Sequence, residues 1–228
     1  MEDATLHTGH RARLKAQFLQ AGLDAFTDIQ VLELLLFYAN PRQDTNPIAH
    51  RLLNQFGTLS AVLDAPVELL ESVKGVGENA ALLLHLIPCV CRRYLIDRAS
   101  YEQILDSTEK AGAFLVPYFF GARDEMVYLL CLDAKCKVLD CRMLSVGGVN
   151  TAAVSVRKIV EAALACNATS VVLAHNHTSG IALPSKEDEA TTRQIRTALD
   201  AVGILLVDHI IVADDDFVSM ADSGFFRT

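Results

Sequence analysis

Two histidines stand two positions apart at the end of an apolar run in the second half of the chain. The run, residues 170–174, predicts a strand covered on both faces. Because side chains alternate along a strand, His175 and His177 project to one side and Asn176 to the other. Two imidazoles placed in this way can share one metal ion, but such a pair taken alone is more often structural.

A carboxylate follows shortly after the two histidines. Ser185 and Asp188 come directly after Pro184, where the sequence predicts the start of a helix. The pair is a variant of the capping box, in which the hydroxyl accepts from a backbone N–H and the carboxylate lies at the positive helix end. A first-turn carboxylate can also be directed back toward the histidines, since Gly180 lets the intervening loop reverse.

These residue types together indicate a particular kind of metal site. Two imidazoles and one carboxylate leave the fourth tetrahedral position to water, as in a catalytic zinc site, whereas a structural zinc would need a fourth protein ligand. The sequence therefore predicts one Zn²⁺ per chain, held by His175, His177 and Asp188.

The elements that must position these residues follow from the hydrophobic period. Residues 10–98 have the helical period, interrupted at Pro41, Pro47, Gly57, Pro66 and Gly75, so residues 1–100 are predicted to form an all-α domain. Residues 101–228 alternate between helices and strands, which predicts an α/β sandwich with a mixed sheet. The predicted helices are 107–116, 154–166 and 185–201, and the predicted strands are 126–132, 138–146, 170–174, 204–213 and 217–219.

The spacing of the site residues matches a known signature. His175-x-His177, then seven residues, Ser185, two residues and Asp188 is the spacing of the JAMM motif. The flanking Ser179-Gly180 and Pro184-Ser185-x-Glu187-Asp188 resemble the RadC group of JAMM/MPN+ metalloproteases. The resemblance covers nearly the whole chain and implies a JAB/MPN-like α/β sandwich after a small helix-hairpin-helix-like domain. The chain departs from the group at Thr178 and at Ile181-Ala182-Leu183, which make the loop beside the substrate unusually apolar.

The resemblance also implies roles for individual residues. It implies a zinc-dependent hydrolase of amide or isopeptide bonds acting on a protein or peptide substrate. Glu125 would be the catalytic base, and Ser185 would donate a hydrogen bond to the developing oxyanion. Asp208 and His209 lie outside the signature, so we expect them to support the structure or the ligands.

The N-terminal domain carries a second motif. Gly75 and Gly77 allow a tight turn between two helices, and the backbone N–H groups there could receive one phosphate of a nucleic acid. Residues 1–104 nevertheless contain nine Lys+Arg against twelve Asp+Glu, so the electrostatic contribution to DNA binding would be small. The hairpin is therefore predicted to pack or to dock protein, and the family label of DNA repair rests on resemblance alone. A DNA-binding accessory protein with a structural or vestigial metal remains the alternative function.

Composition limits the remaining classes. The chain has 228 residues, 51% of them hydrophobic, and a net charge of −8, which disfavours a sequence-independent grip on polyanions. The sequence lacks the H-x-E and P-C-x-x-C pair of zinc deaminases, and its adjacent His-Asn-His differs from the dispersed nuclease motif. No secretion signal and no apolar run of roughly 20 residues is evident, which predicts a cytoplasmic protein without membrane contact. The six cysteines are predicted to be buried free thiols.

Overall fold

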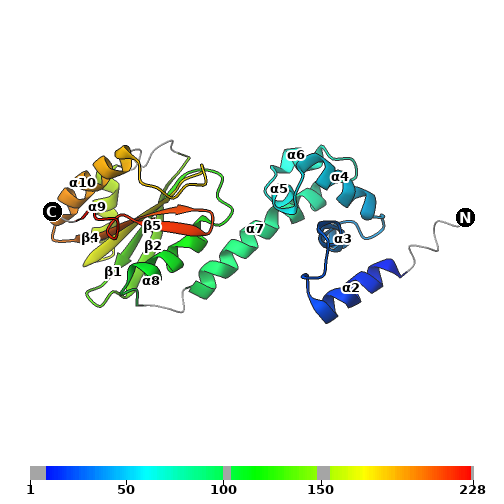
Figure 1. The fold of residues 1–228 in the computed structure, drawn as a ribbon, viewed down its shortest axis with the longest axis horizontal. Helices are drawn as coiled ribbons and strands as arrows, with labels where there is room; N and C mark the ends of the chain where they lie inside the picture. The colour runs from blue at the N-terminus through cyan, green and yellow to red at the C-terminus, as the bar shows by residue number, and fades with distance from the viewer. Residues whose placement is uncertain (1–8, 100–103, 148–154, 227–228) are drawn as a thin grey trace, which may run out of the picture. The chain divides into compact units, whose positions relative to one another are not determined.

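The chain forms two compact units. A computed structural model of it describes residues 9–99, 104–147 and 155–226 (Figure 1). The units are Met1–Cys91 and Arg92–Thr228, and the division falls within the long helix α7 (Glu78–Ala99). The predicted boundary between residues 100 and 101 lies outside the described residues, nine positions beyond this division.

The first unit is helical, as predicted. Two of the predicted interruptions bound one helix, since Pro47 lies in its first turn and Gly57 ends it with φ +89°. The helix before it begins with a capping box between Thr27 and Gln30, which the sequence analysis did not name. The core is lined by Leu32, Leu52 and other fully buried leucines. The elements are α2 (His10–Ala21), α3 (Asp28–Ala39), α4 (Asn46–Phe56), α5 (Leu59–Leu63), α6 (Val67–Glu71) and the start of α7.

Helix α7 is both long and apolar, which the sequence pattern had not indicated. Its most apolar 18-residue window has a mean hydropathy of 1.2, so by length and composition it could cross a membrane. Helices of soluble proteins pass the same test, and Pro88 lies inside this helix. Cys89 and Cys91 are exposed on α7, and only Cys131 of the six cysteines is buried, so the prediction of buried thiols was wrong for most of them, although all six are free.

The second unit is a mixed five-stranded sheet with helices, which confirms the predicted fold class. The strand order is β2-β1-β3-β4-β5, with β3 and β4 parallel and the other neighbours antiparallel. The elements are α8 (Thr108–Leu115), the 3-10 helix η1 (Val116–Phe119), β1 (Met126–Leu132), β2 (Val138–Val146), α9 (Val156–Ala165), β3 (Ser170–Asn176), α10 (Lys186–Asp200), β4 (Leu205–Ala213) and β5 (Asp216–Ser219).

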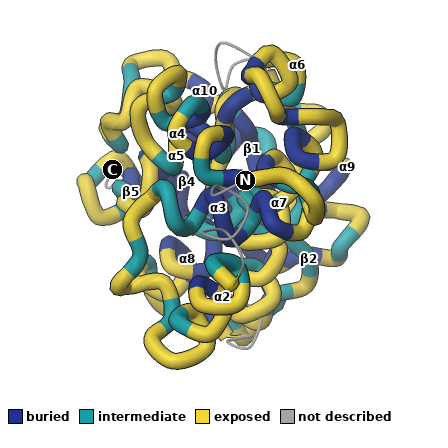
Figure 2. Tube along the Cα trace, turned by 90° about the vertical axis from the view of Figure 1, so that its right-hand side faces the viewer, coloured by how far each residue is buried: buried dark blue, intermediate teal, exposed yellow. Residues whose placement is uncertain are grey.

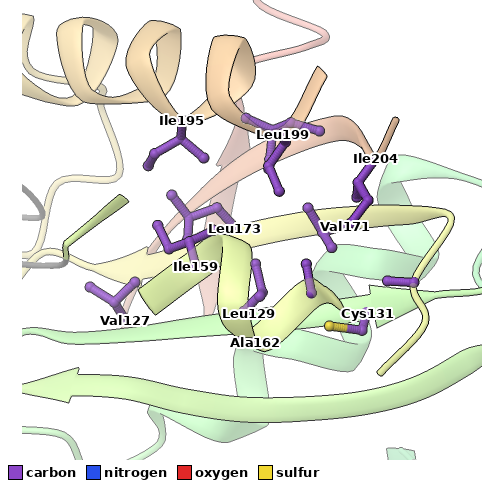
Figure 3. Packing of buried hydrophobic residues seen from close by; sticks show 13 residues of the cluster. Val127, Leu129, Cys131, Ile159, Ala162, Val171, Leu173, Ile195, Leu199 and Ile204 are labelled. Atoms are coloured by element: carbon purple, nitrogen blue, oxygen red, sulfur yellow. The ribbon is translucent and has the colours of Figure 1, made fainter. Parts of the chain in front are cut away.

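Helices cover both faces of the sheet, so β1 and β3 are buried along their whole length. Figure 2 colours the chain by burial, with buried residues in dark blue. On one face, Leu129 of β1 and Leu173 of β3 meet Ile159 of α9 and Ile195 of α10 (Figure 3). On the other face, alternate residues of the same strands, such as Leu130, pack with residues of α8 and η1. This alternation places each residue of β3 on a definite side of the sheet.

The C-terminal end of β3 is longer than predicted. The strand continues to Asn176 because His175 pairs with Val127 of β1 and with Ile211 of β4. Following the alternation from Leu173, the His175 side chain lies on the face covered by α9 and α10. His175 therefore lies at the C-terminal end of a fully buried strand, on the side of the sheet that α10 covers.

A fragment that starts at residue 101 is predicted to fold without the first unit. Among the described residues, the core clusters of the second unit contain no residue before Leu105, so removal of residues 1–100 leaves both faces of the sheet covered. Circular dichroism and thermal unfolding of the fragment should show mixed helix and strand and one cooperative transition. A fragment that is soluble but lacks a cooperative transition would show that this core needs residues 1–100, among them residues 92–99 of the second unit, where Arg92 donates to the Tyr128 hydroxyl.

Gly112 in α8 is predicted to resist replacement by alanine. In a helix interior, Gly→Ala ordinarily stabilises by about 1 kcal/mol. A Cβ at Gly112 would lie 2.2 Å from Cζ of Phe217, so the Phe217 ring must move and lose its packing. We expect Gly112→Ala to lower the free energy of unfolding by about 1–3 kcal/mol, the usual cost of overpacking.

The matched background for this change is Phe217→Ala. Without the ring the obstacle is gone, so Gly112→Ala should then stabilise the helix by its ordinary propensity. Calorimetric unfolding of the two single variants and the double variant measures the coupling between the positions. Independent, additive effects would contradict the proposed clash.

Candidate metal centre

Three donor groups, two imidazoles and one carboxylate, converge at the end of β3. His175 Nε2 lies 2.9 Å from His177 Nε2 and 3.3 Å from Asp188 Oδ1, and His177 Nε2 lies 3.4 Å from Asp188 Oδ2. A tetrahedral zinc with bonds of about 2.0–2.1 Å has ligand atoms about 3.3–3.4 Å apart, close to this spacing. The three residues form a group that can hold a metal ion, and their donor types fit zinc.

The group lies at the wall of a small cavity. His175 and Asp188 are 1% and 3% exposed, while His177 is partly exposed. The cavity has a volume of about 220 Å³ and is otherwise lined by Glu125, Ser185 and their neighbours Ser179 and Glu187. The structure brings all five predicted site residues to this cavity.

Asp188 is directed at the histidines by the capping box that also begins α10. Ser185 donates to Asp188 Oδ2 from its backbone N–H at 2.8 Å and from its hydroxyl at 2.6 Å. In return, the Asp188 backbone N–H donates to Ser185 Oγ at 3.1 Å. The helix-cap and metal-ligand interpretations of this pair are compatible, because the cap keeps the Asp188 carboxylate in an orientation that faces both imidazoles.

His177 is held by the loop that follows it. Its Nδ1 lies 3.1 Å from the carbonyl oxygen of Ile181. Since a carbonyl only accepts, Nδ1 carries the proton and Nε2 keeps its lone pair for a metal. The apolar loop thus supports one ligand through its backbone, while its side chains Ile181 and Leu183 are 59% and 63% exposed.

Glu125 stands immediately before β1 and reaches the cavity without belonging to the ligand group. Burial raises the pKa of its carboxyl; the nearby Asp188 adds to the rise, and His177 opposes it. A carboxylate whose pKa is raised in this way accepts a proton more readily than an exposed one. Glu125 is therefore suited to proton transfer next to the metal ligands.

Asn176 is a further residue of the site. Its sequence position predicted only that its side chain points away from His175 and His177. On the side of β3 opposite to His175, its buried amide accepts from the Met126 backbone N–H at 2.7 Å and donates to the Asp124 carbonyl at 3.2 Å. These bonds hold the backbone on both sides of Glu125. The signal was present in the strand alternation, but the partner segment lies about fifty residues away and only the fold shows it.

Behind His175 lies a second buried histidine. His209 Nε2 is 2.8 Å from His175 Nδ1, and His209 Nδ1 is 2.6 Å from Thr192 Oγ1. Burial lowers the pKa of His175 to about 4 and that of His209 well below its ordinary value, so both rings are neutral near pH 7. Neutral imidazole is the form that binds metal.

Asp208 has a structural position. Its carboxylate accepts from Ser219 Oγ at 2.6 Å and from the backbone N–H groups of His209 and Ala221 at 2.7 and 3.0 Å. These bonds join β4 to the chain segment around the end of β5. Burial raises the pKa of the Asp208 carboxyl, whereas the three donors oppose that rise.

Comparison with known proteins agrees with this geometry. Residues 105–225 match the RadC-like JAB domain. The chain is also 34% identical over 216 residues to the UPF0758 protein SPO0054 of Ruegeria pomeroyi, an alignment that covers 95% of this chain and 96% of that protein. The sheet, the helices on both of its faces and the placement of the motif residues are thus accompanied by similarity along almost the full length. The chain therefore belongs to the RadC family of JAB-domain proteins.

Proposed function

We propose that the second unit is a zinc-dependent hydrolase of amide or isopeptide bonds in protein or peptide substrates. The observation that carries the proposal is the cavity in which a two-histidine, one-aspartate group stands beside an acidic residue that is not part of the group. Three protein donors with open space next to them are typical of catalytic rather than structural zinc. When bound, zinc would supply Lewis acidity to a carbonyl and would lower the pKa of a water molecule bound to it toward about 7.

Glu125 is the proposed general base and acid. Its carboxylate faces the same cavity as the ligands, its pKa is raised by burial, and Asn176 holds the backbone on both sides of it. In the proposed reaction it takes a proton from the attacking water and gives it to the leaving amine.

Ser185 is the proposed donor to the developing oxyanion. Its hydroxyl lines the cavity and, in this structure, donates to Asp188 Oδ2. To serve an oxyanion, the hydroxyl must rotate its proton away from Asp188, which keeps the bond from the Ser185 backbone N–H. The cap can thus persist while the hydroxyl changes partner.

The alternative function, a DNA-binding accessory protein, would use the turn at Gly75–Gly77. A cavity of about 600 Å³ lies there, lined by this turn and by residues 39–43, including Arg42. The turn is also internally bonded, since Asn40 and Arg51 donate to the carbonyls of Gly75 and Lys74. The acidic balance of residues 1–104 favours packing or protein docking there, and DNA binding measured at two salt concentrations would distinguish the alternatives.

Loss of any one ligand is predicted to abolish high-affinity zinc binding. His175→Ala, His177→Ala and Asp188→Ala each leave two protein donors. Because removal of a group that merely supports a ligand costs about 10–100-fold in metal affinity, loss of the ligand itself should cost more than about 100-fold. Zinc titration and elemental analysis measure the affinity and the stoichiometry, and circular dichroism checks that helix content is kept.

The control for Asp188 is Glu189→Ala. Glu189 also lies in the first turn of α10, so its removal takes the same charge from the helix start, but its carboxylate pairs with Arg193. This variant should bind zinc like the unaltered protein. Full zinc affinity in Asp188→Ala would show that Asp188 is only a helix cap.

Glu125→Gln is predicted to keep zinc and to lose hydrolysis. Glutamine preserves size and shape but cannot accept and return a proton, so the rate should fall on the order of 10²–10⁴-fold. The measurement is cleavage of a quenched fluorescent peptide library by the zinc-loaded full chain. Asp124→Asn changes the neighbouring exposed carboxylate and should leave zinc and rate unchanged. An unchanged rate in Glu125→Gln would exclude Glu125 as the base.

A further inference from the structure

We propose that His209 is a positioning residue that holds His175 in the tautomer whose Nε2 is free for a metal. It does so through a buried hydrogen-bond chain that starts at Thr192 on α10. The inference rests on the proposed metal site, and it concerns residues outside the JAMM motif. His209 and Thr192 are 0% and 5% exposed, so water does not compete for their hydrogen bonds.

The hydrogen-bond chain passes through the side chains of His175, His209 and Thr192 and ends on the backbone carbonyl of Asp188. His175 Nδ1 lies 2.8 Å from His209 Nε2, and His209 Nδ1 lies 2.6 Å from Thr192 Oγ1. Thr192 Oγ1 in turn lies 2.6 Å from the carbonyl oxygen of Asp188. The chain therefore connects the backbone of one metal ligand to the imidazole of another.

The carbonyl sets the direction of every proton in the chain. A carbonyl oxygen can only accept, so at 2.6 Å the single hydroxyl proton of Thr192 must point to Asp188. Thr192 Oγ1 then has only lone pairs for His209, which must carry its proton on Nδ1. His209 Nε2 becomes an acceptor, and His175 must carry its proton on Nδ1 to donate to it. The lone pair of His175 is thereby placed on Nε2, the atom that faces His177 and Asp188.

The opposite direction would disable the ligand. If Thr192 donated to His209, then His209 would donate from Nε2 and the proton of His175 would lie on Nε2, between the two ligand imidazoles. That arrangement also sets two oxygen lone pairs against each other at 2.6 Å in a buried place, which is costly. The other acceptor near the Thr192 hydroxyl is the weak Met220 sulfur at 3.6 Å.

A register shift aims His209 at the metal ligand. Val171 of β3 pairs with Leu206 of β4, but the next residue, Val172, pairs with Asp208, so one extra residue is inserted in β4. With uninterrupted alternation from Leu206, position 209 would face the opposite side of the sheet. The inserted residue reverses this and directs His209 to the face of α10, and Asp208 fixes the bend by accepting from the His209 backbone N–H.

The first test is the tautomer of His175 in the metal-free full chain. Long-range ¹H–¹⁵N spectra of histidine-labelled protein distinguish Nδ1–H from Nε2–H imidazoles, and we expect the Nδ1–H pattern for His175. In Thr192→Val and in His209→Leu this preference should be lost, whereas Thr192→Ser, which keeps the hydroxyl, should restore it. The exposed His85 serves as an internal reference that none of the variants should alter.

The second test is zinc affinity of the same variants. Thr192→Val and His209→Leu should weaken zinc binding about 10–100-fold, the usual effect of removing the partner of a metal-bound histidine, and Thr192→Ser should bind like the unaltered protein. Thr191→Val is the matched control, since it removes a neighbouring buried hydroxyl that is not part of the hydrogen-bond chain, and it should leave zinc affinity unchanged. Calorimetric unfolding confirms that each variant is folded before its affinity is compared.

The outcomes separate this inference from the proposed function. An Nε2–H tautomer of His175 in the unaltered metal-free protein, or wild-type zinc affinity in Thr192→Val, would overturn the inference. A different result would contradict the proposed function and still support the role of His209. In that case the unaltered protein shows the Nδ1–H tautomer and no hydrolysis, while Thr192→Val and His209→Leu lose zinc affinity as expected.

Discussion

The site depends on one physical constraint, the crowding of lone pairs at the buried end of β3. Two imidazole nitrogens and a carboxylate lie within 2.9–3.4 Å of one another, and two of the three residues are almost fully buried. Lone pairs held this close repel unless a cation or a proton lies between them, so the arrangement persists only if the surroundings hold each group in place. The neighbouring structure supplies that support at every ligand.

Each ligand is held by a different kind of element. A helix cap holds Asp188, a loop carbonyl holds His177, and a buried side chain on the next strand holds His175. A backbone group supports Asp188 and His177 directly, whereas His209 is connected to a backbone carbonyl through Thr192. Such support costs little conformational entropy when a metal binds, because the ligands are already oriented before binding.

The two faces of β3 carry residues with different roles in the site. His175 faces α10 and belongs to the ligand group, while Asn176, on the opposite side, bonds to the backbone around Glu125. One strand end therefore fixes both the metal ligands and the acidic residue beside them. The packing of β3 on both faces keeps its register, because a slip by one residue would send every side chain to the opposite layer and exchange the sides of His175 and Asn176.

The sequence by itself determined most of the fold and pointed to the three residues that the structure brings together at the end of β3. The strand ranges 126–132 and 138–146 agree with β1 and β2, and the cap at Ser185 was evident, because periodicity and capping are local properties of the chain. The position of Asn176 against residues 124–126 and the partnership of His209 with His175 were decided by tertiary structure. Both depend on pairing between distant strands, and the second also on an inserted residue in β4 that reverses the side-chain alternation. No local pattern predicts such an insertion, because it is defined only by the pairing of β4 with β3.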